Sequence, residues 1–383
     1  MTASTKRPLV IGAGPAGLAA AWALKRVGMR PVLLERADGV CSSWRGHYRA
    51  LRLNSPRYLS SLPGMPMERR LGAWVTRADF LDYVERYAQR VGADIRFGTD
   101  VQRLEHDGEG WALQTSSGAF HAPAVVVATG LNARPHLPDW PGAEGYTREL
   151  IHACDYSQPD RFADRDVLVV GVGASATDIA VELASTGSGR VRLSVRTPPL
   201  IYRRNGATAL MSQLVKHGWV PAPLFDRLSL MLHDLLYGDL SAYGLERPRE
   251  GMATSLAKRG HGATMDRGLI AALKSRRLAV VSAVSAFDGD EVLLADGARI
   301  RPDVVIAGTG QRPDLDRLAG HLGVLIPPGG RPSVHGAKTA YTAPHLYFLG
   351  FRLPAGQLPD LGIDARAIAR RMARNQPLAA HQP

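Results

Sequence analysis

Residues 8–17 have the sequence Pro8-Leu9-Val10-Ile11-Gly12-Ala13-Gly14-Pro15-Ala16-Gly17, and the alanine-rich run Leu18-Ala19-Ala20-Ala21-Trp22-Ala23-Leu24 follows. The apolar residues before Gly12 predict a short buried strand, and the alanine-rich run predicts a helix. Between them stands Gly-x-Gly-x-x-Gly, the pattern of a dinucleotide-binding loop. In this pattern Gly12 makes the tight turn, Gly14 lets the backbone approach a pyrophosphate, and Gly17 lets the helix pack closely on the strand.

The residues that follow support a nucleotide site at this loop. The helix would begin at Pro15 and Ala16, where free N–H groups and the positive end of the helix dipole favour phosphate. A second apolar run ends in Glu35, 18 residues after Gly17. An acid at this distance accepts a hydrogen bond from a ribose 2′-hydroxyl. Strand, loop, helix and acid together favour a dinucleotide-binding βαβ unit over a surface turn.

The second half of the chain repeats this arrangement with one chemical difference. Residues 167–170 predict a strand, and Gly171-Val172-Gly173-Ala174-Ser175-Ala176 follows, with alanine in the third glycine position. The next predicted strand ends in Arg196, 20 residues after Ala176. An arginine there pairs with a 2′-phosphate. The first site is therefore predicted to bind FAD or NAD and the second NADPH, which favours a flavoprotein reduced by NADPH.

Length and charge limit the class of protein. The 383 residues, 45% of them hydrophobic, predict about two domains of globular type. The apolar runs are too short for a membrane span, and the polar N-terminus is not a signal peptide, so we expect a cytoplasmic protein. The net charge is +12, but the arginines are scattered. We therefore expect no nucleic acid partner, since anionic dinucleotides account for the cationic sites.

The two cysteines, Cys41 and Cys154, are far apart in sequence. They provide neither a disulfide framework nor a Cys-x-x-Cys redox pair. No cluster of cysteine and histidine has the spacing of a zinc site, so we expect no metal.

The order of predicted elements indicates an α/β protein with two Rossmann-like dinucleotide-binding domains, the NADPH domain being inserted within the FAD domain. Apolar strands that end in Thr129-Gly130 and Thr309-Gly310 precede the two crossings between the domains. We expect residues 1–157 to form the first part of the FAD domain, 158–307 the NADPH domain with an irregular helical segment at 197–265, and 308–383 the second part of the FAD domain.

Several segments predict individual elements. Residues 77–91 predict a helix that is begun or capped by Asp79, and residues 94–104 and 111–116 predict strands joined by a hairpin turn. Residues 223–237 predict an amphipathic helix. Contact of this helix with a membrane is one alternative. We expect its apolar stripe instead to be core or to line a substrate tunnel, because its polar face lacks the lysines and arginines of a membrane-surface helix.

These motifs resemble class B flavin-dependent monooxygenases, above all the YUCCA-like branch of the flavin-containing monooxygenases. The resemblance covers most of the chain, including both glycine-rich loops and the run Ala128-Thr129-Gly130. The identifying stretch of the family, Phe-x-Gly-x-x-x-His-x-x-x-Tyr, has Tyr146 and Arg148 in its Phe and Gly positions here and keeps His152 and Tyr156.

The resemblance implies that NADPH reduces FAD and that the reduced flavin forms a C4a-(hydro)peroxide with molecular oxygen, which then oxygenates a small organic substrate. It implies that Asn54 lies near the flavin ring as the catalytic candidate, that Val101 lies near the adenine, and that His152 anchors the linker. We expect further cofactor contacts from Glu35, Arg36, Trp44, Arg45, Thr129, Gly130, Gly171, Gly173, Ala174, Ser175, Ala176, Arg196, Thr309 and Gly310.

The sequence leaves three reactions open: N- or S-oxygenation, Baeyer–Villiger-type insertion, and oxidative decarboxylation of a 2-oxo acid. It also leaves two other classes, an NADPH-dependent flavoprotein reductase or oxidase and a non-catalytic flavin-binding redox sensor. A disulfide reductase would need the missing cysteine pair, and a sensor would not need Arg196. A homo-oligomer without stable membrane insertion is compatible with the sequence.

Overall fold

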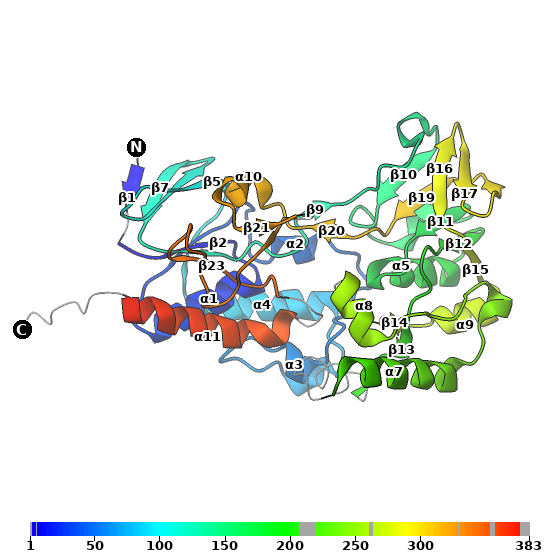
Figure 1. The fold of residues 1–383 in the computed structure, drawn as a ribbon, viewed down its shortest axis with the longest axis horizontal. Coiled ribbons are helices and arrows are strands. Elements are labelled where there is room, and N and C mark those ends of the chain that lie inside the picture. The colour runs from blue at the N-terminus through cyan, green and yellow to red at the C-terminus, as the bar shows by residue number, and fades with distance from the viewer. Residues whose placement is uncertain are drawn as a thin grey trace, which may run out of the picture.

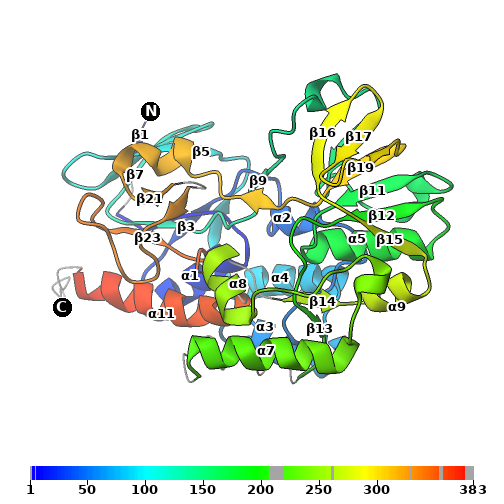
Figure 2. The same ribbon diagram turned by 45° about the vertical axis from the view of Figure 1, so that its right-hand side comes forward.

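The computed structural model describes residues 2–4, 6–206, 220–259, 263–327, 330–352 and 357–375. Two large parallel sheets lie in separate halves of the molecule (Figures 1 and 2). Each sheet is continued by a smaller, mainly antiparallel unit. The α/β class with two dinucleotide-binding folds is confirmed.

The first sheet contains the strand predicted before Gly12. Its strands run in the order β23-β8-β2-β3-β4, all parallel, with bounds β2 (Leu9–Ile11), β3 (Val32–Leu34), β4 (Asp94–Arg96), β8 (Val125–Val127) and β23 (Leu346–Phe348). The strand order reverses between β2 and β8, and ligands of such sheets bind at this reversal, beyond the carboxyl ends of the strands.

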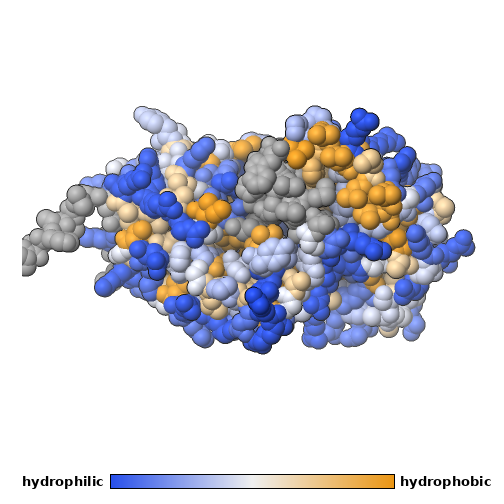
Figure 3. All heavy atoms as spheres, turned by 90° about the horizontal axis from the view of Figure 1, so that it is seen from below, coloured by the Kyte–Doolittle hydropathy of each residue, from blue (hydrophilic) through white to orange (hydrophobic). Residues whose placement is uncertain are grey.

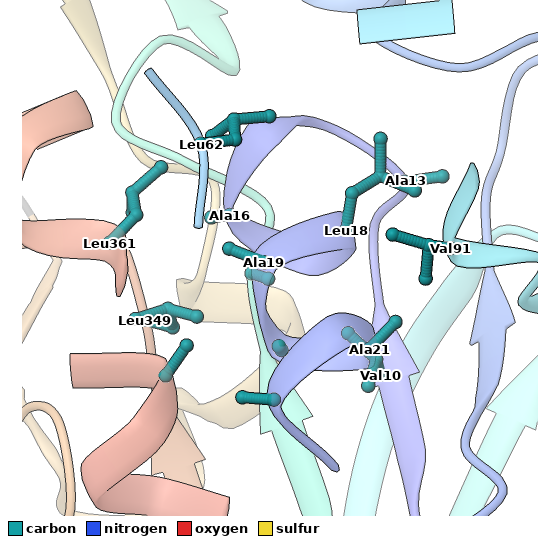
Figure 4. Close-up of a cluster of buried hydrophobic side chains, with 14 of the residues drawn as sticks. Val10, Ala13, Ala16, Leu18, Ala19, Ala21, Leu62, Val91, Leu349 and Leu361 are labelled. Atoms are coloured by element: carbon teal, nitrogen blue, oxygen red, sulfur yellow. The ribbon is translucent and has the colours of Figure 1, made fainter. Parts of the chain in front are cut away.

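Helices cover one face of this sheet: α1 (Pro15–Arg26), α4 (Arg77–Val91) and α11 (Gln357–Asn375). The small side chains of α1 allow α11 to lie close against it, so that Ala16 and Ala19 face Leu361 of α11 and also Leu349, which follows β23 (Figure 4). The predicted bounds of α4 are confirmed. Its N-cap is Thr76, whose hydroxyl accepts from the backbone N–H of Asp79 at 3.1 Å, and Gly92 ends it in the left-handed conformation.

The expected strand at 94–104 is two strands in different sheets. Residues 94–96 are β4 of the first sheet, and the chain turns at Gly98, with φ of +65°, before β5 (Val101–His106) begins. This turn moves β5 into a sheet with the order β1-β7-β6-β5, completed by β1 (Thr2–Ser4), β6 (Trp111–Thr115) and β7 (Gly118–Ala122). The predicted hairpin between β5 and β6 is confirmed.

The second large sheet has the order β10-β19-β11-β12-β15, again all parallel, with bounds β10 (Glu149–His152), β11 (Val167–Val170), β12 (Val191–Ser194), β15 (Leu278–Val281) and β19 (Val304–Ala307). Two helices, α5 (Ala174–Ser185) and α9 (Leu269–Lys274), pack on it. The structure places β10 in this sheet, although it precedes residue 158, where we expect the NADPH domain to begin. A meander of β16 (Val284–Asp288), β17 (Glu291–Leu294) and β18 (Arg299–Ile300) extends this half.

The two crossings between the halves lie side by side. The short strands β9 (Arg134–Pro135) and β20 (Gln311–Arg312) form an antiparallel pair between the two large sheets (Figure 1). The remaining described elements are short or belong to the segment 197–265: α2 (Ser42–Arg45), α3 (Arg57–Ser60), η1 (Arg69–Leu71), η2 (Ala143–Gly145), η3 (Pro159–Phe162), β13 (Ile201–Arg203), α7 (Ala222–Tyr237), η4 (Ser241–Tyr243), α8 (Met252–Arg259), β14 (Thr264–Asp266), α10 (Asp316–Ala319), η5 (Gly320–Leu322), β21 (Leu325–Ile326) and β22 (Arg331–Pro332).

The expectation that the apolar stripe of 223–237 is core or tunnel lining is wrong for most of the stripe, in which Phe225 and Leu232 pack in a core but most other leucines and Met231 are exposed. The helix α7 buries Phe225, Ser229, His233 and Tyr237, which recur every four residues. Its leucine- and methionine-rich face is outside, with Met231 62% and Leu235 81% exposed. In the view from below, hydrophobic residues gather on the side of the molecule where α7 lies (Figure 3). Among the described helices none is long and apolar enough to cross a membrane.

Candidate active site

The glycines of the first loop have the geometry that the turn requires. Gly12 has φ of +100°, and a Cβ built on it would lie 2.9 Å from the carbonyl oxygen of Ala128. A Cβ on Gly17 would overlap the carbonyl oxygen of Gly12, so only glycine lets α1 pack this closely on β2. A Cβ on Gly14 would meet nothing within 4 Å, since this backbone faces open space. Packing therefore explains Gly12 and Gly17, whereas Gly14 is the N-cap of α1 and its backbone lies open to the cavity.

Glu35 lies at the end of β3 beside this loop. Its carboxylate accepts from the backbone N–H of Ala13 at 2.7 Å and from the backbone N–H of Ala37 and the hydroxyl of Ser42, both at 3.1 Å. The side chain is buried and lines the cavity described below. These three bonds fix the carboxylate, and its four lone-pair sites leave an acceptor for a ribose hydroxyl.

A cavity of about 600 Å³ extends from the first loop toward the second half of the molecule. Both dinucleotide loops contribute to its wall, because Gly14 and Glu35 line it together with Gly173 and Ala174. The structure places the following expected site residues on the wall: Gly12, Gly14, Pro15, Ala16, Glu35, Arg36, Trp44, Asn54, Val101, Thr129, Gly130, Gly173 and Ala174.

Trp44 and Asn54 line the cavity between the two loops. The ring of Trp44 packs against Phe80, with ring centroids 4.5 Å apart, which holds the indole in place. Asn54 follows Leu53, whose backbone N–H donates to the carbonyl of Val75 at 2.9 Å. Asn54 is exposed to the cavity, so its amide is available to a ligand.

Arg45 lies outside the cavity wall. Its guanidinium forms an ion pair with Glu85 on α4 and donates to the carbonyl of Val40 at 3.2 Å. These contacts direct the side chain toward α4 and away from the place expected for it at the cofactor. Gly17 is also absent from the wall because it is packed against Gly12.

The second loop repeats the geometry of the first, with one compensating change. Gly171 has φ of +110°, and a Cβ on Gly173 would meet nothing within 4 Å. A Cβ on Gly308, at the end of β19, would lie 2.5 Å from the Cβ of Ala176. Alanine is therefore tolerated in the third position because the facing residue is glycine. Ser175 and Ala176 continue into α5 and do not line the cavity.

Arg196 follows the end of β12, on the same edge of the sheet as the second loop. Its side chain is exposed, and it forms no ion pair with another described residue. An exposed cation at this position suits a 2′-phosphate.

His152, Tyr156, Thr309 and Gly310 lie at the crossings between the halves. The Nε2–H of His152 donates to the carbonyl of Gly310 at 2.9 Å, because its Nδ1 accepts from the backbone N–H of Cys154 at 3.1 Å. Burial lowers the pKa of His152, which favours the neutral ring. The hydroxyl of Thr309 donates to the carbonyl of His136. These bonds tie the two crossing segments to each other.

Tyr156 is buried in the second half, where its hydroxyl donates to Glu182 on α5 at 3.0 Å. Burial and the nearby carboxylate raise the pKa of Tyr156, so the phenol keeps its proton. Neither Tyr156 nor His152 lines the cavity. Tyr156 connects the linker to α5 of the second half, whereas His152 connects the two crossing segments to each other.

The sequence did not indicate several residues of the cavity wall. Asn205, Thr264 and Met265 line it next to Trp74. They reach the cavity because β13 and β14 pair in parallel and because the Thr264 hydroxyl donates to the carbonyl of Val172 at 2.6 Å. No spacing or motif could have found these residues, since the pairing of β13 with β14 is a tertiary contact. The described residues contain no group of three acidic, histidine or cysteine side chains able to hold a metal ion.

The family model of the pyridine nucleotide-disulphide oxidoreductases matches residues 9–212, and curated relatives cover more of the chain. An indole-3-pyruvate monooxygenase, YUCCA1 of Oryza sativa subsp. japonica, is 30% identical over 90% of this chain and 86% of its own length. A probable indole-3-pyruvate monooxygenase, YUCCA8 of Arabidopsis thaliana, is 32% identical over 80% of this chain and 75% of its own length. The chain belongs to the family of the YUCCA flavin monooxygenases.

Solved structures agree with this assignment. A mutant form of the flavin monooxygenase from Stenotrophomonas maltophilia has a TM-score of 0.74 at 26% identity, and the match covers 97% of this chain and 99% of its own. The bacillithiol disulfide reductase Bdr of Bacillus cereus shares the fold, with a TM-score of 0.71 at 20% identity and coverage of 98% of this chain and 100% of its own. The chain is thus an FAD- and NADPH-dependent monooxygenase that uses molecular oxygen and acts on small molecules.

The cysteines do not favour a disulfide reductase. Cys41 is buried against the first loop, where its backbone N–H donates to the carbonyl of Ala13 at 3.2 Å. Burial raises the pKa of its thiol, which keeps it unreactive. Cys154 lies at the linker and is also unpaired.

Proposed function

We propose that this monooxygenase holds FAD along the wall that begins at Gly14 and holds NADPH at the second loop, so that both cofactors meet in one cavity. The observation that carries the proposal is that Gly14 of the first loop and Gly173 and Ala174 of the second line the same cavity. Hydride transfer requires the two reacting rings to touch, and a shared cavity allows this.

The residues present fit a bound flavin dinucleotide. The open backbone at Gly14 and the N-terminus of α1 suit its pyrophosphate, and Glu35 suits its ribose. Val101 at the start of β5 and the preceding Thr99 line the cavity and suit the adenine. Trp44 and Asn54 would lie beside the flavin ring. Gly17 supports this site through packing, and Arg36, Thr129 and Gly130 complete its wall.

We propose that NADPH binds at the other loop with its pyrophosphate at Gly171, Gly173 and the start of α5 and with its 2′-phosphate at Arg196. Residues 158–307 would then form the NADPH domain, inserted between the two parts of the FAD domain at 1–157 and 308–383. The strand β10 would be contributed to the NADPH domain by the segment before residue 158.

A bound flavin would accept hydride and activate oxygen. The protein binds and orients the two nucleotides and excludes water from the reacting end. We infer that the Asn54 side chain, which is available at the cavity wall, offers a hydrogen bond to the reacting groups. Trp44 and Trp74 give that end of the cavity apolar walls.

The relatives named above are indole-3-pyruvate monooxygenases, and we propose a 2-oxo acid as the first substrate class to test. Amines, sulfides and ketones are the competing classes. We also propose a cytoplasmic location, because both cysteines are unpaired thiols, as in reducing compartments.

The test measures NADPH oxidation and product formation together, with purified protein whose flavin content is determined first. The expected result is a yellow protein in which one substrate class gives close to one product per NADPH consumed. A protein that binds no flavin, or that turns all NADPH into hydrogen peroxide with every class, would contradict the proposal.

A further inference from the structure

The segment 46–53, which we call the bridging loop, connects the two halves of the molecule. It begins after α2 in the first half and ends immediately before Asn54 at the cavity wall. Tyr48 of this loop is only 2% exposed, and it packs in the core of the second half with Ala176, Ile179 and Ala180 of α5. One loop therefore contributes both a side chain to the second half and the residue preceding Asn54.

The hydroxyl of Tyr48 makes a polar contact inside this packing. It donates to Oδ2 of Asp178 at 2.6 Å, on the second turn of α5. The same carboxylate forms an ion pair with Arg267, and the side chain of Asp178 is 8% exposed. Arg267 in turn donates to the carbonyl of Ala50 at 2.9 Å. Two residues of the bridging loop, Tyr48 and Ala50, thus bind the paired side chains of Asp178 and Arg267 in the second half.

The position of Asp178 connects this set of bonds to the second nucleotide loop. Asp178 lies four residues after Ala174, so it is one helical turn from the end of α5 that lines the cavity. A rigid helix transmits a fixed position over one turn. Tyr48 therefore sets where the start of α5 lies relative to Asn54, six residues along the same chain.

We propose that Tyr48, Asp178 and Arg267 form a positioning link that holds the start of α5 against the flavin cavity. This link would place the nicotinamide of NADPH where it can transfer hydride to the flavin. This proposal rests on the proposed function, because it requires NADPH at the second loop and FAD at the first. Tyr48 acts through Asp178 and does not touch the cofactors. None of these three side chains lines the cavity.

The Tyr48→Phe variant tests the link because it removes the hydroxyl and keeps the ring in the core. We expect the limiting rate of flavin reduction at saturating NADPH to fall about tenfold, the lower end of the factor that corresponds to one lost hydrogen bond to a charged group. A synthetic dihydronicotinamide without the adenosine diphosphate part is not carried by the second loop. Its rate of flavin reduction should stay unchanged in the same variant.

The matched control is Tyr87→Phe. Tyr87 is equally buried but lies in the first half, where its hydroxyl donates to the carbonyl of Pro63 at 2.9 Å. We expect this variant to reduce its flavin with NADPH as fast as the parent protein. Flavin content and melting temperature are measured for all three proteins.

The outcomes separate the link from the function that it serves. If Tyr48→Phe and Tyr87→Phe are reduced by NADPH at the parent rate, the positioning link is refuted and the proposed function stands. If both hydride donors are slowed equally, Tyr48 has a merely structural role, which also refutes the link. If the parent protein holds flavin that NADPH does not reduce, the proposed function fails and the link fails with it.

Should Tyr48→Phe lose its flavin, Asp178→Asn supplies the second measurement. The amide keeps the size of the carboxylate and an acceptor for Tyr48, but it removes the charge that pairs with Arg267. The same selective loss with NADPH is expected. Equal rates with the parent protein would overturn the proposal.

Discussion

Replacing Gly17 or Gly14 of the first loop by alanine should have different effects, a loss of stability for Gly17 and a loss of FAD affinity for Gly14. The Cβ of Gly17→Ala would overlap the carbonyl oxygen of Gly12, far inside the 3.0 Å below which Cβ contacts essentially do not occur. Backbone cannot rotate away as a flexible side chain would, so α1 must shift on β2. The Cβ of Gly14→Ala meets no atom within 4 Å, and Gly14 has an ordinary φ of −79°.

The expected magnitudes follow from these environments. Overpacking of a rigid core costs about 1–3 kcal/mol, and a backbone obstacle belongs at the upper end or beyond it. Alanine regains up to about 1 kcal/mol of helix propensity over glycine, so the net loss for Gly17→Ala is about 2 kcal/mol or more. For Gly14→Ala the loss at the N-cap and the lower entropy of the unfolded chain offset each other to within about 1 kcal/mol. Its added methyl instead occupies the space where we place the pyrophosphate.

The assay is urea unfolding of the flavin-free proteins, combined with titration of each protein with FAD. Flavin-free protein is required because bound FAD itself raises the apparent stability. We expect Gly17→Ala to unfold at clearly lower urea concentration, and Gly14→Ala to keep the parent midpoint but lose most of its affinity for FAD. Parent-like stability of Gly17→Ala would refute the packing argument. Parent-like FAD affinity of Gly14→Ala would refute the placement of the pyrophosphate.

Two further predictions concern the second nucleotide site and the linker. Arg196→Ala should raise the KM for NADPH about tenfold and leave the KM for NADH unchanged, since only NADPH offers a 2′-phosphate to the arginine. Arg190→Ala, at the opposite end of β12, is the control, and equal effects on both nucleotides would contradict the assignment. Burial lowers the pKa of His152 below its usual value of 6.5, so the unfolded chain binds the proton more readily. The free energy of unfolding should therefore fall as the pH drops below 6.5. His152→Gln should lessen that fall by up to about 1.4 kcal/mol per pH unit, as measured by urea unfolding. An unchanged pH profile in this variant would show that His152 is not a source of the loss.

Local patterns predicted the parts of the fold that depend on a few neighbouring residues. The positive φ of Gly12 and Gly171 is a property of the turn itself, so both loops could be found from glycine spacing. The bounds of α4 could be predicted from its apolar face, but the expectation that Asp79 begins or caps the helix is wrong, because Thr76 is the N-cap and Asp79 lies in the first turn. Glu35 could be assigned to the first loop because it follows directly on the apolar residues of β3, at a fixed distance in sequence from Gly17.

The orientation of α7 could not be predicted from the sequence pattern. Its apolar stripe predicted a buried face, yet the helix packs through Phe225 and His233 and exposes Leu235. Hydrophobic periodicity gives the two faces of a helix, but the neighbouring elements decide which face is covered. The split of 94–104 into β4 and β5 has a similar origin, because the turn at Gly98 sends the two parts of one predicted strand into different sheets.

The sequence by itself determined that this protein has two dinucleotide loops, because each loop needs a glycine turn, a following helix and one charged residue at a set distance. These loops indicated a flavoprotein that is reduced by NADPH, and the resemblance of further motifs to the flavin-dependent monooxygenases implied the reaction class. Only the tertiary structure decided that the two loops line one cavity, that Asn205 and Met265 join its wall, and that Tyr48 reaches across to Asp178. These contacts join residues far apart in the chain, and no local spacing encodes the packing that brings them together.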